Sequence, residues 1–433
     1  MAITKTVVSI ILLYLGLLSI NFSFFPLGPR TIYSILALFL ILKSKQLNLF
    51  LKSSEIVNSF GYLFIWGGLS LISVTIYGTK DFYFISFIIS QLNSLLSSLF
   101  LAYVLYFKFK YNSDKIIDLA IVSIFIFEIS GILMFAFPDI KDLILSITVR
   151  SSNYEQEFLN NTGFRLIGFG PTFFGAGVMS GLGLILLSYR LTSKLDHKVS
   201  YALYILVYII VLFSGLLASR STLIGFFISL FILIFNTNSF RIKRLIPITG
   251  ILLILFWITM YMISNSEKMN ITHITRFGFE FYYNFIETGK LQTSSSENLM
   301  EMIKFPKSFY TYILGDGYFV DPTTSFFYQG TDIGYLRIIY YSGVFALISI
   351  MIYYYKLFYS KWLLMNNKKI IINSLFLYLI VLYFKGLTDF NDFMFIFLIV
   401  SYFQQSENIQ QNDAELHEKN NFKFKGNLQY SNR

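Results

Sequence analysis

Twelve apolar stretches dominate this chain, and each is long enough, or nearly long enough, to cross a lipid bilayer. A membrane-spanning helix needs roughly 20 mainly apolar residues, because it must cover the hydrocarbon layer while satisfying its own backbone hydrogen bonds. With 55% hydrophobic and 13% charged residues, a soluble domain could not bury this chain around one core. We therefore expect an all-α integral membrane protein with about 12 transmembrane helices. The predicted spans are residues 6–25, 30–42, 56–77, 83–107, 116–137, 166–189, 199–217, 221–236, 245–264, 333–355, 370–384 and 390–404.

Lysine and arginine collect in every second gap between these stretches. The five short gaps assigned to the inside hold sixteen of them, whereas the short gaps assigned to the outside hold four: Arg30, Lys80, Arg220 and Lys385. Because positive residues in short loops stay on the cytoplasmic side, this split predicts an even number of spans with both termini in the cytoplasm. The net charge of +10 then reflects loops that face anionic lipid, and we expect no nucleic-acid partner.

One of the outer gaps, from about residue 265 to 332, is long enough to form a large ordered loop between the ninth and tenth spans. Its sequence predicts helical segments at 282–287 and 297–303, and turns at 294–296 and 321–324.

The chain therefore divides into a polytopic transmembrane domain over residues 1–404 and a polar cytoplasmic tail over 405–433. The loop at 265–332 belongs to the transmembrane domain, and we expect it to cap the functional site of the protein.

Cysteine is absent, so the chain can form neither a disulfide nor a thiolate metal site. No cluster of His, Asp and Glu has metal-ligand spacing, and we expect no metal and no cofactor. The sequence also has no internal repeat of fixed period, which weakens a transporter interpretation, since many transporters are built from paired repeats.

Arginine is unevenly placed. A guanidinium binds phosphate bidentately and keeps its charge, so several at one membrane face suit a lipid-linked phosphate or pyrophosphate. Lipid headgroup contact is the alternative explanation, and we favour it for Arg30 and Arg150. For Arg165, headgroup contact and a functional role are equally favoured. For Arg220 we favour a functional role, because it sits between two spans with hardly any loop. Six of the ten arginines fall in outer segments: Arg30, Arg150, Arg165, Arg220, Arg276 and Arg337.

A Gly-x-Gly motif at Gly315 and Gly317 is followed by Asp332, Arg337 and Gly343 at the start of the tenth span. On a helix beginning near Asp332, the Asp332 and Arg337 side chains could project into one region near the bilayer surface. Asp332 could also serve as a helix N-cap, and the two roles could coexist.

A second set of charges brackets the outer turn between the last two predicted spans. There we expect a local salt bridge of Lys385 with Asp389 or Asp392, although these residues could line the same cavity as the arginines.

These features resemble the O-antigen polymerase family (Wzy), within a wider group that includes the O-antigen ligases. In that group a Gly-x-Gly, a polar residue, a hydrophobic helix and a further Gly close a large periplasmic loop, and Gly315, Gly317, Asp332 and Gly343 fill this pattern. Ligases generally have His where this chain has Asp332, which favours the polymerase. The family holds lipid pyrophosphate with periplasmic arginines, and the positions that fit are Arg165, Arg220, Arg276 and Arg337.

The resemblance implies glycosyl transfer between two oligosaccharides linked to undecaprenyl pyrophosphate, at the periplasmic face of a bacterial inner membrane. Cations placed where charge develops on the leaving pyrophosphate would lower the barrier, and a carboxylate or imidazole could take the acceptor proton. Asp332 is the first choice for this base, His273 the second and Glu280 the third.

The partners implied are the lipid-linked oligosaccharide and membrane lipid, together with a chain-length regulator and a flippase of the same pathway. Two alternatives stay open from the sequence: a ligase that passes glycan to a lipid A core, and a polysaccharide flippase. The long one-sided loop argues against the flippase.

Overall fold

The computed structural model describes residues 2–149, 165–193, 198–235, 276, 280–290, 292–324, 326–365 and 368–408. Within these residues the chain forms helices joined by turns and contains no β-strand, apart from isolated bridges between Phe22 and Thr148 and between Val320 and Phe327. The all-α class predicted from the sequence is confirmed for this part of the chain.

Six of the described helices are long and apolar enough to cross a membrane, as expected for a multi-pass membrane protein. They are α4 (Ser54–Tyr77), α5 (Tyr83–Tyr103, continued by a π-helical turn at Val104–Lys108), α6 (Ser113–Ala136), α9 (Phe173–Thr192), α10 (Lys198–Ala218) and α17 (Gly334–Phe358).

Other apolar helices are shorter or bent. Helices α2 and α3 are bent by 109° relative to each other, so that α3 occupies part of the expected loop after the second span. A further helix covers residues 391–408, and α18 is a single short turn. The bounds are α1 (Ala2–Leu17), α2 (Pro29–Lys43), α3 (Lys45–Leu51), α7 (Pro138–Ile147), α11 (Thr222–Phe235), α18 (Lys361–Met365) and α19 (Lys369–Leu382).

Two expected span boundaries are wrong. Helix α1 ends at Leu17 rather than at residue 25, because the chain turns near Ser19, which has a φ of +49°, and the following residues pair with 147–149. Helix α9 begins at Phe173 rather than at residue 166, because Gly168, Gly170 and Pro171 precede it in non-helical backbone. The expected span 245–264 lies outside the described residues, and a total of twelve stays a prediction.

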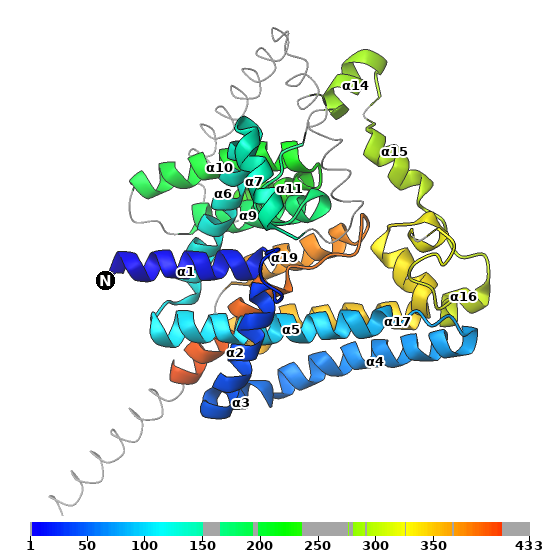
Figure 1. The fold of residues 1–433 in the computed structure, drawn as a ribbon, viewed down its shortest axis with the longest axis horizontal. Helices are drawn as coiled ribbons and strands as arrows, with labels where there is room; N and C mark the ends of the chain where they lie inside the picture. Colours follow the sequence, from blue (N-terminus) through cyan, green and yellow to red (C-terminus); the bar gives the residue numbers. More distant parts are fainter. Residues whose placement is uncertain are drawn as a thin grey trace, which may run out of the picture.

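Helix α9 is the centre of the bundle half that carries α10 and α11 (Figure 1). Its small residues let the neighbours approach closely: a Cβ on Gly225 of α11 would collide with the Cα of Gly181, and one on Gly177 would lie 2.9 Å from the Cβ of Ser219. This approach brings the turn between α10 and α11, which contains Arg220, against the N-terminal end of α9.

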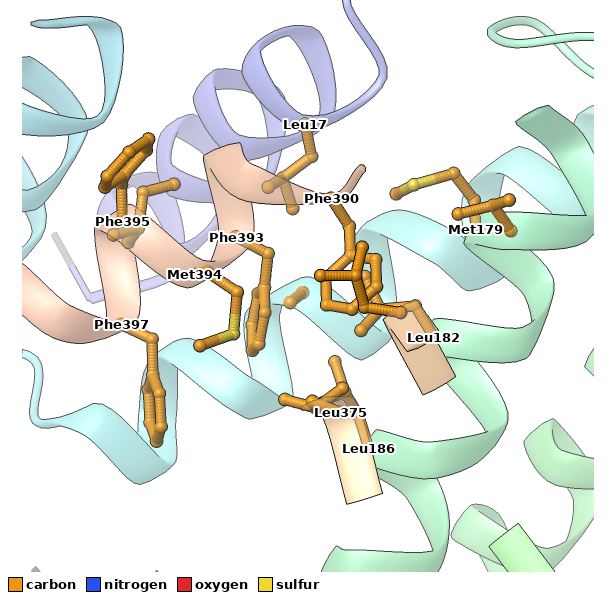
Figure 2. Packing of buried hydrophobic residues seen from close by; sticks show 14 of the residues in the cluster. Leu17, Met179, Leu182, Leu186, Leu375, Phe390, Phe393, Met394, Phe395 and Phe397 are labelled. Atoms are coloured by element: carbon orange, nitrogen blue, oxygen red, sulfur yellow. The ribbon is translucent and has the colours of Figure 1, made fainter. Parts of the chain in front are cut away.

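The helix over residues 391–408 passes through the core and is buried along most of its apolar length. Figure 2 shows Phe393 and Phe397 on this helix, Leu17 on α1, Leu182 on α9 and Leu375 on α19, all within one apolar cluster. The 383–390 turn that precedes the helix is thereby placed beside α9.

Polar contacts between distant segments fall into two sets, and neither set joins a segment assigned to the inside with one assigned to the outside. In Figure 1 the N-terminus lies at the left, whereas α15 and α16 lie at the right. The contacts between segments assigned to the inside are Lys368–Asp114, Arg190–Asp118 and Tyr106–Glu407, and those between segments assigned to the outside are Arg30–Asp392, Lys385–Ser221 and Thr79–Gly317. Asp392 also accepts a hydrogen bond from Ser94, halfway along α5.

The loop at 265–332 is called the outer loop after its predicted side. Its described part contains three short helices, α14 (Glu280–Thr288), α15 (Ser294–Glu301) and α16 (Phe309–Leu314), and a 3-10 turn at Tyr328–Gly330. The predicted turn at 321–324 is confirmed, since the Asp321 carboxylate accepts hydrogen bonds from the backbone amides of Thr323 and Thr324. The predicted turn at 294–296 is wrong: these serines form the first turn of α15, because Thr293 caps it in a capping box with Ser296.

Candidate functional site

The outer loop joins helix α17 at a pair of glycines. Gly315 ends α16 with a φ of +76°, and Gly343 kinks α17 with a φ of +83°. A Cβ on Gly315 would lie 2.5 Å from the carbonyl carbon of Tyr341, and one on Gly343 would collide with the carbonyl oxygen of Ile313. Both positions therefore need glycine for backbone conformation and for space.

Gly317, the third predicted loop glycine, fixes the next segment against the α4–α5 turn. Its φ is +73°, its backbone amide donates to the carbonyl of Tyr341 at 3.1 Å, and its carbonyl accepts from the Thr79 hydroxyl at 2.6 Å. Two residues later, the Asp81 carboxylate accepts from the backbone amides of Phe319 and Val320 at 2.8 and 3.2 Å. The Gly-x-Gly motif thus orients the Phe319 side chain toward α17.

Asp332 and Arg337 form an ion pair at the start of α17. An Arg337 nitrogen lies 3.0 Å from an Asp332 carboxylate oxygen, and the two side chains are 10% and 32% exposed, respectively. The N-cap role considered for Asp332 is wrong: Ile333 is the N-cap, and its backbone amide donates to the Thr331 hydroxyl. The Asp332 carboxylate faces Arg337 instead of the first amides of α17.

Two phenyl rings cover the Arg337 guanidinium. Its central carbon lies 3.9 Å from the ring centroid of Phe319 and 4.3 Å from that of Phe327. The Phe319 ring is stacked in turn on Tyr83 of α5, with centroids 3.4 Å apart and an interplanar angle of 6°. Neither ring was singled out from the sequence, because aromatic residues are too common in this chain for any one to be distinguished.

Burial dominates the electrostatics of Asp332. Desolvation raises the pKa of its carboxyl to about 6, while Arg337 and Lys385 act in the opposite direction by favouring the ionised form. A carboxyl that titrates near 6 is ionised at neutral pH and still basic enough to accept a proton, which are the two properties a general base needs.

Lys385, after α19, lies beside Asp332, and two further cations from distant segments gather around Lys385: Arg165 before α9 and Arg220 between α10 and α11. Burial, together with the positive charges of Arg220 and Arg165, lowers the pKa of Lys385 to about 8, against the opposing effect of Asp332. The same repulsion by Arg220, added to burial, lowers the pKa of Arg165 to about 10. These cations are close enough to repel one another, which is the arrangement of an anion-binding site.

Lys385 occupies a different place from the one expected. The local salt bridge predicted for it is wrong: its ammonium donates to the Ser221 hydroxyl at 2.9 Å and lies over the Phe174 ring, while Asp392 pairs with Arg30. The buried turn after α19 packs against α9 and so turns Lys385 toward Arg220. Two sequence signals pointed to Lys385: it is one of four cations in the short outer gaps, and the charges around its turn could line the same cavity as the arginines.

Glu280, the third candidate base, is engaged with Arg220. Their closest atoms lie 2.5 Å apart, and the same carboxylate accepts hydrogen bonds from the backbone amide and hydroxyl of Ser294 at 2.8 and 3.2 Å. One carboxylate of the outer loop thus covers a cation of the site and caps α15.

The structure does not bring every predicted residue to this site. Arg276 pairs with Glu287 at 2.7 Å, and these side chains are 57% and 44% exposed. His273 lies outside the described residues. Among the residues that are described, no three His, Asp or Glu side chains gather as they would around a metal ion.

A cavity of about 150 Å³ lies on the other side of the 383–390 turn, between α1 and α9. Arg30 and Asp392 line it as an ion pair, so the lipid contact favoured for Arg30 is replaced by a protein partner. Asp389 also lines it and accepts a hydrogen bond from Gln91 at 2.8 Å. Most of the other lining residues are apolar, among them Leu17, Met179, Leu182 and Phe393 (Figure 2).

The chain matches no protein-family model, no curated protein and no solved structure.

Proposed function

We propose that this protein polymerises lipid-linked oligosaccharide repeat units, transferring a growing glycan from undecaprenyl pyrophosphate to a sugar hydroxyl of the next lipid-linked unit at the periplasmic face of a bacterial inner membrane. The observation that carries the proposal is the gathering of Arg165 and Arg220 around Lys385, which itself lies beside Asp332, at one end of a bundle of apolar helices.

The three cations suit the leaving group. As the bond between the anomeric carbon and the pyrophosphate oxygen breaks, negative charge builds up on the pyrophosphate, and fixed cations in a partly buried site stabilise that charge. Arg165 and Arg220 offer planar guanidinium groups that can bind phosphate oxygens bidentately, and Lys385 adds a point charge. The lipid tail would remain in the bilayer beside the apolar helices.

Asp332 suits the acceptor side. Its partly exposed carboxylate can accept the proton of the acceptor hydroxyl while the oxygen of that hydroxyl forms the new bond to the anomeric carbon. The electron pair of the broken bond leaves with undecaprenyl pyrophosphate. In this proposal the cations and the base are the separate parts that a displacement at a glycosyl phosphate needs.

The deciding experiment is the glycan profile of a strain that lacks the gene, complemented with variants of the full chain. We expect Asp332→Asn and Arg220→Ala to accumulate in the membrane but to leave single repeat units in place of long chains. Glu287→Gln, which alters only the exposed pair with Arg276, should restore normal chains.

The deletion strain itself distinguishes the reaction classes. Single repeat units on the lipid core support the polymerase. A bare core would replace it by the ligase, and repeats held at the inner leaflet would replace it by a flippase. Normal chain-length ladders from both site variants would remove the assignment of the site.

A further inference from the structure

Arg337 differs from the other cations of the site in what covers its charged group. The rings of Phe319 and Phe327 lie over its guanidinium at 3.9 and 4.3 Å, and its edge is bonded to Asp332. Arg165 and Lys385 each lie over a single ring, at 5.4 and 5.8 Å, and Arg220 is as little exposed as Arg337 but is covered by a carboxylate. A diphosphate that approached Arg337 would have to displace two aromatic rings and a carboxylate from the segment just before α17.

Arg220 is covered in another way. Its ionic partner, Glu280, belongs to a short helix of the outer loop and is itself an oxyanion. A phosphate oxygen can replace a carboxylate oxygen with the same hydrogen-bonding geometry, so exchange of Glu280 for a diphosphate needs no change in the chemistry of the contact.

The cover over Arg337 is anchored by backbone bonds. Asp81 holds the amides of Phe319 and Val320, and an isolated bridge joins Val320 to Phe327, so one small turn presents both rings. Phe319 is only 5% exposed and rests on Tyr83. A cation–π contact strengthens when the cation is desolvated, which favours a fixed guanidinium.

We propose that Arg337 is a positioning residue, held by the Phe319 and Phe327 rings, that orients and charges the Asp332 carboxylate and does not bind the diphosphate, which is left to Arg165, Arg220 and Lys385. That Asp332 acts as a base rests on the proposed function, whereas the pairing and its effect on Asp332 do not.

The charged groups around Asp332 determine how each substitution should change the protonation of its carboxyl. Arg337 faces it from α17 and Lys385 from the turn after α19, while Arg220 and Arg165 lie behind Lys385, and Tyr83 lies beyond Phe319. Removal of Arg337 takes away the larger of the two charges that keep the Asp332 carboxyl ionised against burial. Removal of Arg220 leaves both of them in place.

The test measures the protonation of Asp332 without glycosyl transfer. Carbodiimides modify protonated carboxyl groups, so mass spectrometry of purified full-length protein modified at a series of pH values gives the midpoint for Asp332. We expect a midpoint near pH 6 in the unaltered chain. In Arg337→Ala it should rise by about 1–3 pH units, the effect of losing an adjacent opposite charge.

Three further variants make the comparison specific. Arg337→Lys keeps the charge but not the planar group and should shift the midpoint less than Arg337→Ala. Phe327→Leu removes a ring that is 39% exposed, so the variant should keep the fold. It should shift the midpoint of Asp332 upward, because Arg337 is held less firmly. Arg220→Ala should leave the midpoint unchanged.

Binding of inorganic pyrophosphate to the same preparations completes the test. Arg220→Ala should weaken it roughly tenfold, the loss expected for a charged hydrogen bond, whereas Arg337→Ala should leave it unchanged. An unchanged midpoint in Arg337→Ala, or loss of pyrophosphate binding in that variant, overturns the inference. If Arg337→Ala shifts the midpoint of Asp332 but still gives normal glycan chains, the proposed function is overturned while the inference stands.

Discussion

The Glu280 carboxylate on α14 lies 2.5 Å from the Arg220 guanidinium and also accepts a hydrogen bond from the backbone amide of Ser294 at the start of α15. One side chain of the outer loop therefore connects a cation of the candidate site to the fold of the loop. Substrate phosphate would have to compete with this carboxylate for Arg220.

Replacing Glu280 with Gln should strengthen pyrophosphate binding. The neutral amide can still accept the Ser294 hydrogen bond through its oxygen but no longer competes by charge, and loss of a partly exposed ion pair worth about 1 kcal/mol corresponds to a roughly fivefold lower Kd. Titration calorimetry on the purified protein measures this change. Glu287→Gln is the matched control on the same helix, and equal effects from the two variants would contradict the prediction.

The polymerisation rate should pass through a maximum between about pH 6 and pH 8. Below the lower limit Asp332 is protonated and cannot accept a proton, and above the upper limit Lys385 loses the charge that binds diphosphate. Arg165 in the same site has a pKa of about 10, well above that of Lys385, so Lys385→Arg should move the alkaline limb up by about two pH units and keep the acidic one. Chain growth in membrane vesicles at a series of pH values measures both limbs. A profile of Lys385→Arg that still falls near pH 8 would exclude Lys385 from the alkaline limb.

Gly343→Ala should lower the thermal stability of the purified protein. Gly343 combines a φ of +83° with a ψ of 176°, a backbone region open essentially to glycine that costs an alanine about 1–3 kcal/mol, and the added Cβ also meets the carbonyl oxygen of Ile313. Gly78→Ala is the reference for a positive φ without steric contact: Gly78 is in the left-handed helical region, nothing lies within 4 Å of the added Cβ, and the variant should lose about 1–2 kcal/mol. Equal melting temperatures for the two variants would remove steric contact as the reason for glycine at 343.

Single-cysteine labelling should divide the loops into the two predicted sides, because the chain has no cysteine of its own. A membrane-impermeant maleimide added to spheroplasts should modify Lys80→Cys and Lys290→Cys, whereas Lys52→Cys and Lys110→Cys should react only after permeabilisation. All four positions are exposed. Modification of Lys110→Cys in sealed spheroplasts would reverse the orientation on which the candidate site depends.

The apolar stretches by themselves predicted the helical class and most helix positions, because a chain in lipid must satisfy its backbone hydrogen bonds within each segment. The Gly-x-Gly motif and Gly343 also marked the junction between the outer loop and α17, where the backbone has positive φ values that few other residues adopt. Boundaries at Leu17 and Phe173 could not be read in this way, because apolar residues continue past the point where the backbone leaves the helix.

Side-chain partners were decided by the tertiary structure. Asp332 and Arg337 are local in sequence, and their proximity could be predicted, but the partner of Arg220 is 60 residues away in the outer loop and Lys385 comes to the site only because its turn packs on α9. The sequence determined which charges were available at one end of the bundle. Which of them meet phosphate, which meet one another and which are covered by aromatic rings depends on helix packing, because charge interactions act across space and not along the chain.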